Sequence, residues 1–276
     1  MKGRFFRCAA LSVLVPCCFG VAQTTENSGL TAVAHIALRV SDVDAELRFL
    51  AKLGYEEAFV HQENGRMAFS FVKVNDREFL EIHPRIPLDG KAPLPLGFNH
   101  ICFVTGDAKA EQALWAERGL NPSAVTKGPD GTLEFLAKDP SGGVTEALQI
   151  LPDSQPGRDI GEHLGPNRVS GWLSGIELPV NDLATWRKFY EANGFTATSE
   201  GPAVRLRSPA NPRLQVVFDS SQRDERASLL FLVEDSNKAA RDLKSAGLQA
   251  DVSDRQVTVR DPDGNLFVLT QELVGR

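Results

Sequence analysis

The stretch His35-Ile-Ala-Leu-Arg-Val40 is an extended apolar segment that runs into Asp42, and Gly54 follows that Asp by twelve residues. A short run rich in Ile, Leu and Val favours a β-strand. Asp commonly begins a helix, because its carboxylate accepts hydrogen bonds from the unpaired amide groups of the first turn. Gly commonly ends one, because it adopts the left-handed conformation without strain. The stretch therefore predicts a strand followed by a helix that ends at Gly54.

This pattern occurs four times in the chain. The later copies have strands at 100–104, 175–180 and 228–233, helix starts at Asp107, Asp182 and Asp235, and helix ends at Gly119, Gly194 and Gly247. Each Asp again precedes its Gly by twelve residues. After each Gly come short apolar runs separated by turn residues, such as Asp139-Pro-Ser-Gly142 in the second copy. Each copy predicts a βαβββ unit, and the four together predict an α+β fold.

The composition is that of an ordinary globular protein. Hydrophobic residues make up 42% of the 276 residues and charged residues 24%, which is enough apolar material for a large core. The formal charge is −6. Nucleic acids and anionic membranes bind basic surfaces, so we expect neither as a partner.

The first 22 residues have the features of a signal peptide. Lys2, Arg4 and Arg7 form a positive region, an apolar run follows from 8 to 22, and Gly20-Val-Ala22 suits cleavage before residue 23. The run is shorter than the roughly 20 residues of a membrane span. We therefore expect a bacterial protein that is periplasmic or secreted, without a stable membrane span after cleavage. Cleavage would leave Cys102 as the only cysteine, so no internal disulfide is expected.

Four βαβββ units in tandem, with Asp261-Pro-Asp-Gly-Asn265 before the last strand, resemble the vicinal oxygen chelate superfamily. This superfamily includes glyoxalase I, bleomycin-resistance proteins and extradiol dioxygenases. The resemblance implies that the units pair into two glyoxalase-like half-barrels. We assign residues 31–152 to the first half, 153–170 to a linker and 171–273 to the second half.

In metal-dependent members of this superfamily, each unit of a half-barrel can donate one ligand from the head of its first strand and one from its last strand. Here the corresponding residues are His35 and Glu81 in the first unit, and His100 and Glu146 in the second. Each His precedes its Glu by 46 residues. Imidazole and carboxylate ligands together suit Zn, Ni, Co, Mn or Fe. The resemblance therefore implies one divalent ion per chain, held by these four residues.

The second half lacks this pattern. Gly175 and Ser228 stand at its strand heads, and Val268 stands where the second unit has Glu146. Gln215 is the nearest candidate ligand in the third unit, and a single Gln cannot hold a metal ion. We expect the second half to be either a scaffold or a cavity that binds without metal.

Three further residues fall on the face of the predicted ligands. Strand alternation places His83 on the face of Glu81, where it would line the cavity and shuttle protons, unless it lies in solvent at the strand end. Cys102 shares a face with His100 and is expected to be a small buried residue or a neighbour of the ligands. Arg39 shares the face of His35, where it would meet an anionic substrate or form a surface ion pair.

The resemblance implies a metal-dependent enzyme acting on a small oxygenated molecule. The set of two His and two Glu is most similar to that of glyoxalase I-type isomerases and lyases, in which Glu146 or Glu81 would leave the metal and take a proton. An extradiol-type dioxygenase is a second reading, although it needs only one carboxylate beside two His. A non-catalytic, resistance-type binding protein is a third, although such proteins usually lack the ligands. Export would also separate the protein from the cytosolic thiol used to make the glyoxalase I substrate.

The signal peptide gives the first prediction. Protein recovered from the periplasm or the medium is expected to begin at or close to Gln23, because the apolar run is too short to stay in the membrane. N-terminal sequencing checks this directly. An intact Met1 on a membrane-bound product would contradict it.

Overall fold

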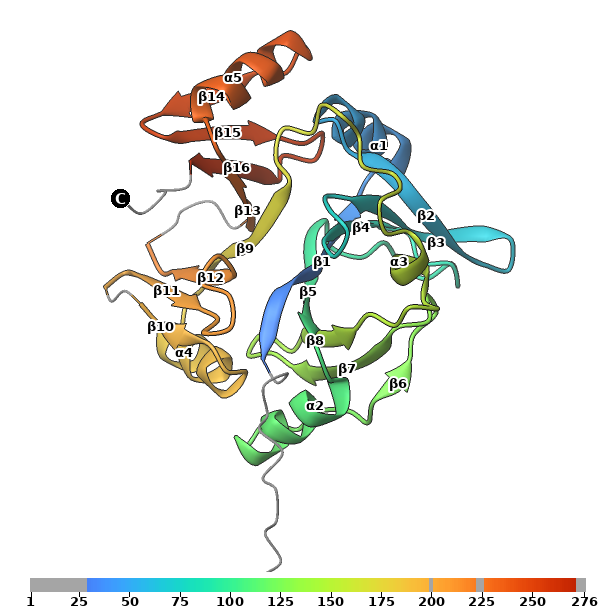
Figure 1. The fold of residues 1–276 in the computed structure, drawn as a ribbon, viewed down its shortest axis with the longest axis vertical. Helices are drawn as coiled ribbons and strands as arrows, with labels where there is room; N and C mark the ends of the chain where they lie inside the picture. The colour runs from blue at the N-terminus through green and yellow to red at the C-terminus, as the bar shows by residue number, and fades with distance from the viewer. Residues whose placement is uncertain (1–28, 199–200, 222–225, 272–276) are drawn as a thin grey trace, which may run out of the picture.

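The computed structural model describes residues 29–198, 201–221 and 226–271, so the predicted signal peptide lies outside the described residues. Two curved sheets, joined by a connector, make up this part of the chain (Figure 1). The first sheet contains β1 (Leu30–Val40), β2 (Glu56–Glu63), β3 (Arg66–Lys73), β4 (Phe79–Pro84), β5 (Gly97–Thr105), β6 (Thr126–Lys127), β7 (Leu133–Lys138) and β8 (Val144–Gln149). The second contains β9 (Trp172–Pro179), β10 (Thr196–Ala197), β11 (Ala203–Arg207), β12 (Gln215–Asp219), β13 (Ser228–Val233), β14 (Ala250–Ser253), β15 (Gln256–Arg260) and β16 (Leu266–Gln271).

The described helices follow the first strand of each unit, with one exception. They are α1 (Val43–Lys52), α2 (Ala108–Glu117), α4 (Leu183–Ala192) and α5 (Ser236–Ser245), with the single-turn α3 (Gln155–Arg158) in the connector. None of these helices combines the length and apolar character that crossing a membrane requires. The order of elements confirms the predicted α+β fold of four βαβββ units.

Both sheets have the same strand order. It is β2-β3-β4-β1-β5-β8-β7-β6 in the first and β10-β11-β12-β9-β13-β16-β15-β14 in the second. In each unit the first strand pairs in parallel with the last strand of the same unit, and the first strands of two units pair antiparallel. Two units thereby form one continuous sheet of eight strands, as the predicted half-barrels require.

The helix boundaries agree with the sequence pattern. The side chains of the four predicted Asp residues all accept hydrogen bonds from amide groups of the first helical turn. Gly54 has φ of 82°, and a Cβ atom there would lie 2.4 Å from the carbonyl oxygen of Asn167. Only Gly satisfies both the left-handed backbone and this close approach of the connector.

The strand heads are a correction to the sequence analysis. His35 was placed at the head of its strand, but β1 begins at Leu30, and β5 begins at Gly97 rather than at His100. The residues before His35 are mostly buried and continue the pairing with β5, with Leu30 opposite Thr105. Both His residues therefore lie inside their strands, where the neighbouring strands hold them from two sides.

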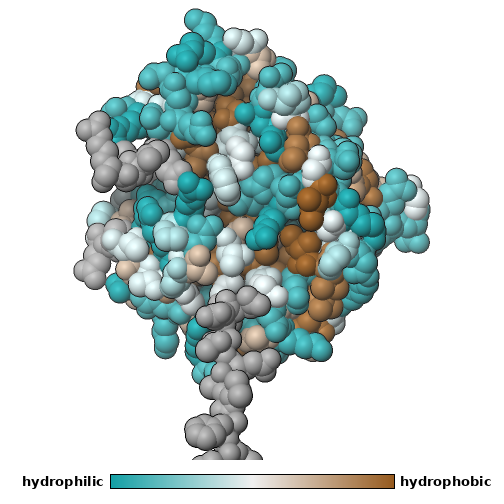
Figure 2. Space-filling view, viewed as in Figure 1, coloured by the Kyte–Doolittle hydropathy of each residue, from teal (hydrophilic) through white to brown (hydrophobic). Residues whose placement is uncertain are grey.

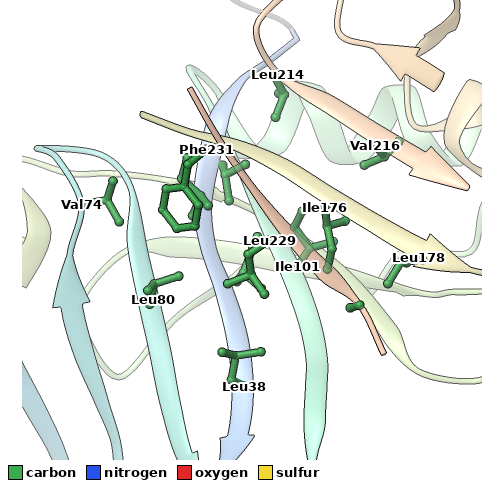
Figure 3. Close-up of a cluster of buried hydrophobic side chains, with 14 of the residues drawn as sticks. Leu38, Val74, Leu80, Ile101, Ile176, Leu178, Leu214, Val216, Leu229 and Phe231 are labelled. Atoms are coloured by element: carbon green, nitrogen blue, oxygen red, sulfur yellow. The ribbon is translucent and has the colours of Figure 1, made fainter. Parts of the chain in front are cut away.

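A shared hydrophobic core joins the two sheets. Leu38 and Ile101 of the first sheet and Ile176, Leu229 and Phe231 of the second belong to one buried cluster (Figure 3). Side chains alternate along a strand, so the other face of β1, which carries His35, points away from this core. In the view of Figure 2 the surface is mostly hydrophilic, with an apolar strip on the right side.

The connector is fastened to both units of the first half. The amide of Gln155 donates to the carbonyl oxygen of Asp130 (2.7 Å) in the turn before β7. At the other side, the fully buried Lys73 of β3 donates to the Asp159 carboxylate (2.9 Å) and to the Glu162 carbonyl (2.8 Å), and pairs with Asp76 (3.0 Å). The connector thus bridges the turns β3–β4 and β6–β7.

Lys73 gives a stability prediction. Lys73→Ala would leave the mostly buried Asp159 carboxylate with His163 (2.6 Å) as its remaining ion-pair partner and without the buried Lys73 ammonium, and we expect a loss of about 3–5 kcal/mol of unfolding free energy. Urea unfolding measures it, and limited proteolysis should then cut near residue 160 faster. Lys127→Ala is the control, because its pair with Asp153 is exposed and worth about 0.5 kcal/mol. Similar losses from both variants would contradict the role of Lys73.

Candidate metal centre

Strand register brings the four predicted ligands to one face of the first sheet. Directly paired residues of neighbouring strands point to the same face. Two adjacent rows across the sheet result, with His35, Cys102 and Glu146 in one and Glu81, Ala37 and His100 in the other. The two rows are built alike, since each has a His at one end and a Glu at the other. The residue between them, Cys102 or Ala37, lies two positions after the His of the other row.

The side-chain atoms of the four residues converge. The two imidazole Nε2 atoms of His35 and His100 are 3.0 Å apart. Glu81 Oε2 lies 3.5 Å from the first and 3.3 Å from the second, and Glu146 Oε2 lies 3.7 Å and 3.5 Å from them. Ligand atoms placed tetrahedrally about 2.1 Å from one ion are roughly 3.4 Å apart. The distances from each carboxylate oxygen to the two imidazole nitrogens therefore fit a divalent ion, and ligand atoms of His35, Glu81 and His100 all lie within 4.8 Å of one another.

Two buried polar atoms of this cluster, Glu81 Oε2 and His83 Nε2, have no hydrogen-bond partner among the described residues. Glu81 Oε2 is buried and has no aligned donor, although Nε2 atoms of His35, His100 and His83 all lie within 3.5 Å. Leaving a buried carboxylate oxygen unsatisfied is costly. A cation among these atoms would satisfy the carboxylate and the imidazole lone pairs together, so the donor set fits a metal ion of the Zn, Ni, Co, Mn or Fe type.

The electrostatics of the cluster point the same way. Burial alone would raise the pKa of Glu81, but His35 and the contacts with His100 and His83 hold that pKa well below its ordinary value. Burial alone would lower the pKa of His35, but the carboxylates of Glu81 and Glu146 raise it. Two carboxylates buried together attract positive charge, which either protonated imidazoles or a metal ion supplies.

His83 lies beside the candidate metal ligands and is mostly buried, as in the first of the two expectations. Its Nε2 atom is 3.1 Å from Glu81 Oε2, and its side chain is only 21% exposed. Arg39 pairs with His83 across β1 and β4 and shares its face, two positions along β1 from Ala37. Burial lowers the pKa of Arg39, and no carboxylate of the described residues forms an ion pair with it. The surface ion pair considered for Arg39 is thus not what the structure shows.

Cys102 is fully buried between the ligands. It lies in the row of His35 and Glu146, and one potential ligand atom from each of the three lies within 4.8 Å of the others. Burial, with Glu146 next, raises the pKa of the thiol well above its ordinary value. The neutral thiol packs with Val104 and Leu148, as expected of a small buried residue beside the site.

Glu134 is a further residue of the site that the sequence pattern did not predict. Leu136 of β7 pairs with Glu146, so Glu134 lies two positions before it on the same face of the sheet. Burial, followed by the charges of Glu146 and Asp130, raises the pKa of Glu134 to about 7. Alternation along β7 groups Glu134 with Leu136, but only the pairing with β8 shows that this group faces the site.

Aromatic side chains of β3 form an apolar wall beside His35 and His83, which the sequence pattern also did not predict. The Phe71 ring lies 5.5 Å from the His35 ring, and the Phe69 ring lies 5.2 Å from the His83 ring. Phe59 and Phe79 pack on Phe71. The alternating aromatics at 69 and 71 are visible in the sequence, but the strand pairing decides which face they share.

The second half corrects one assignment. Gln215, the nearest candidate ligand in the third unit, pairs with Gly175 as Phe79 pairs with His35, so it does not occupy the position equivalent to Glu81. The positions equivalent to the four ligands are Gly175, Val217, Ser228 and Val268. Val217 and Val268 instead form a buried apolar cluster with Leu230. Hydrocarbon thus replaces both carboxylates, and Gln215 donates to Ser174 (3.2 Å).

Comparison with known proteins gives one family and a set of similar folds. Residues 32–146 match the model of the Glyoxalase/Bleomycin resistance protein/Dioxygenase superfamily. A catechol 2,3-dioxygenase structure is 15% identical over 89% of both chains, with a TM-score of 0.67. A Mn(II)-bound glyoxalase from Novosphingobium aromaticivorans is 16% identical over 89% of this chain and 83% of its own, with a TM-score of 0.66.

A third similar structure is an extradiol ring-cleaving dioxygenase from B. fuscum. It is 14% identical over 89% of this chain and 73% of its own, with a TM-score of 0.61. At such identities the likeness shows a shared fold and no more. No curated protein matches the sequence.

The converging ligand atoms give a metal prediction. Purified protein supplied with divalent metal is expected to hold about one ion per chain, because only the first sheet carries the ligands. His35→Ala and His100→Ala should each remove that ion, while Gln215→Ala should keep it. Elemental analysis by mass spectrometry measures the content. Two ions per chain, or unchanged metal in the double His variant, would contradict the placement.

Proposed function

We propose, from the match of residues 32–146 to the glyoxalase/bleomycin resistance protein/dioxygenase superfamily, that the chain is a member of this superfamily and a divalent-metal-dependent enzyme of glyoxalase I-like isomerase or lyase chemistry. Its substrate would be a small oxygenated molecule. The observation that carries the proposal is the convergence of two imidazoles and two carboxylates from two repeated units.

His35, Glu81, His100 and Glu146 would hold the metal. A bound divalent ion would supply Lewis acidity to substrate oxygens and so lower the pKa of a neighbouring C–H group. The two carboxylates are not equivalent in the structure. Glu81 is 7% exposed and stands among three imidazoles, whereas the side chain of Glu146 is 20% exposed. Glu146 therefore has more room to move and contact a substrate.

Glu146 is our candidate for the general base. It would take a proton from the carbon beside the substrate oxygen and return it to the neighbouring carbon. Glu81 would keep the site together because its contacts with His35, His100 and His83 restrain it. His83, partly exposed beside Glu81, is placed to exchange protons between the cluster and solvent.

The surroundings of the site favour an amphipathic substrate. Phe69 and Phe71 offer an apolar wall close to the two imidazoles of His83 and His35. Arg39 is half-buried on the same face and has no carboxylate partner among the described residues. An anionic group on the substrate would supply that partner.

An extradiol-type dioxygenase is the second candidate. The fold is shared with catechol 2,3-dioxygenase and with other ring-cleaving enzymes, which supports this candidate at the level of fold alone. Its chemistry calls for two His and one carboxylate with open positions for substrate and oxygen. The second carboxylate would take one of those positions if an ion were bound, so we rank the isomerase or lyase first. Oxygen consumption separates the two.

The proposal predicts a large effect of Glu146→Gln. This variant keeps the size of the side chain but removes its charge, so turnover should fall at least ~100-fold, as for loss of a general base. Turnover would be measured on a panel of α-hydroxycarbonyl and catechol compounds, with an oxygen electrode to detect dioxygenase activity.

Gln215→Ala is the matched control in the second sheet and should keep nearly full turnover. Metal content and unfolding are measured for both variants, so that a loss of ion or fold is not taken for a loss of the base. Equal losses of turnover from the two, with metal and fold intact, would show that both halves share one active site. Metal-loaded protein that binds panel compounds without turning any over would favour a resistance-type binding protein.

A further inference from the structure

The two halves also meet at helix α1, where Phe49 and Phe267 of their shared core are in contact. Helix α1 of the first half packs against the turn between β15 and β16, where the Phe49 and Phe267 rings lie 5.2 Å apart. The Asp263 carboxylate in this turn accepts hydrogen bonds from the Ser41 amide (2.7 Å) and hydroxyl (2.6 Å). Ser41 directly follows β1, so the turn holds the end of the strand that carries His35.

Glu46 is buried within this contact without a donor. It is 1% exposed, and neither of its carboxylate oxygens has a hydrogen-bond partner among the described residues. The charged groups that face it are Asp261 and Asp263 of the turn. Arg226 reaches the same turn, where its guanidinium donates to the backbone carbonyl of Asp263 (2.8 Å). Glu46 is thus a buried acid that faces other acids.

An ionised Glu46 would be unfavourable here. A buried carboxylate without a donor or a cation loses its hydration and gains nothing in exchange. Burial raises the pKa of Asp261 above its ordinary value, but the hydrogen bonds that its carboxylate accepts from the amide (2.7 Å) and the side chain (2.5 Å) of Asn265 oppose this and favour its charged form. Burial, followed by the charges of Asp261 and Asp263, raises the pKa of Glu46 to about 9.

We infer that Glu46 carries a proton in the folded protein and donates its hydroxyl to the Asp261 carboxylate, which makes this contact a pH-sensitive latch between the two halves. In the unfolded chain Glu46 would lose its proton above the ordinary pKa of 4.5. The folded state therefore binds one proton more than the unfolded state between about pH 5 and pH 9. The stabilisation by the latch is full in mild acid and declines as the pH rises through this range.

Glu46→Gln tests the latch in the full chain. Gln has the same shape and donates an N–H to Asp261 at every pH, so it removes the proton dependence and keeps the contact. Equilibrium unfolding in urea would be measured at pH 5.5, 6.5, 7.5 and 8.5. The folding constant of the wild type relative to the variant should fall about tenfold per pH unit. Glu78, whose pKa is raised to about 8 by burial, and the His residues are the same in both proteins, so their titrations cancel.

Glu117→Gln, on the exposed end of α2, is the control and should follow the wild type at every pH. Parallel curves for the wild type and Glu46→Gln would overturn the latch, because Glu46 would then titrate alike in both states. Stabilisation of the wild type by Ca²⁺ that Glu46→Gln loses would also overturn it, because a cation rather than a proton would join the carboxylates.

A second measurement covers the case in which Glu46→Gln does not fold. Infrared spectroscopy of the wild type in D₂O at pH 7 should show a protonated carboxylic acid that is lost on raising the pH to 10. Asp261→Asn removes the accepting charge, so the pH at which this band disappears should fall. Absence of the band in the wild type, or a band unchanged by Asp261→Asn, would contradict the latch.

Discussion

The antiparallel pairing of β1 with β5 is the contact on which the candidate site depends. It joins the first strands of two units, and each of these strands pairs on its other side, in parallel, with the last strand of its own unit. This register places His35 opposite Cys102 and His100 opposite Ala37. A shift by one residue would turn one unit's ligands to the opposite face of the sheet, into the core. The hydrophobic residues between the ligands prevent such a shift because they must stay in that core.

The second sheet shows that this pairing does not require the metal site. It repeats the strand order and the register, yet Val217 and Val268 stand where the first sheet has Glu81 and Glu146. An apolar cluster stabilises the sheet by burial alone. Buried carboxylates cost free energy unless they are paired or bound to metal. Their retention in the first sheet alone is therefore better explained by chemistry than by folding.

Three of the buried ionisable residues, Lys73, Glu81 and Glu46, are satisfied in different ways. Lys73 is surrounded by carbonyl and carboxylate oxygens of the connector. Glu81 is surrounded by imidazoles at the candidate centre. Glu46 faces only carboxylates, for which a proton is the simplest neutralising partner. All three groups join segments far apart in the sequence, so the arrangement of the two halves depends on electrostatics as well as on the core.

The sequence alone determined the four units, their helix boundaries and the residue types of the candidate site. Local physical rules were enough for the units and helix boundaries, because the Asp and Gly at the helix ends act on backbone groups within a few residues. The choice of the four ligands followed from the family resemblance. The equal spacing of His35 to Glu81 and of His100 to Glu146 was likewise visible because the units repeat.

Only the tertiary structure decided which side chains meet. Strand register decided three features of the site. It brings His83 into contact with Glu81, turns Glu134 toward the site, and places Val217 at the position equivalent to Glu81 in the second sheet. The partners of Glu46 come from the other half of the chain. Register and docking are set by the burial of many side chains at once, and no short stretch of sequence contains that information.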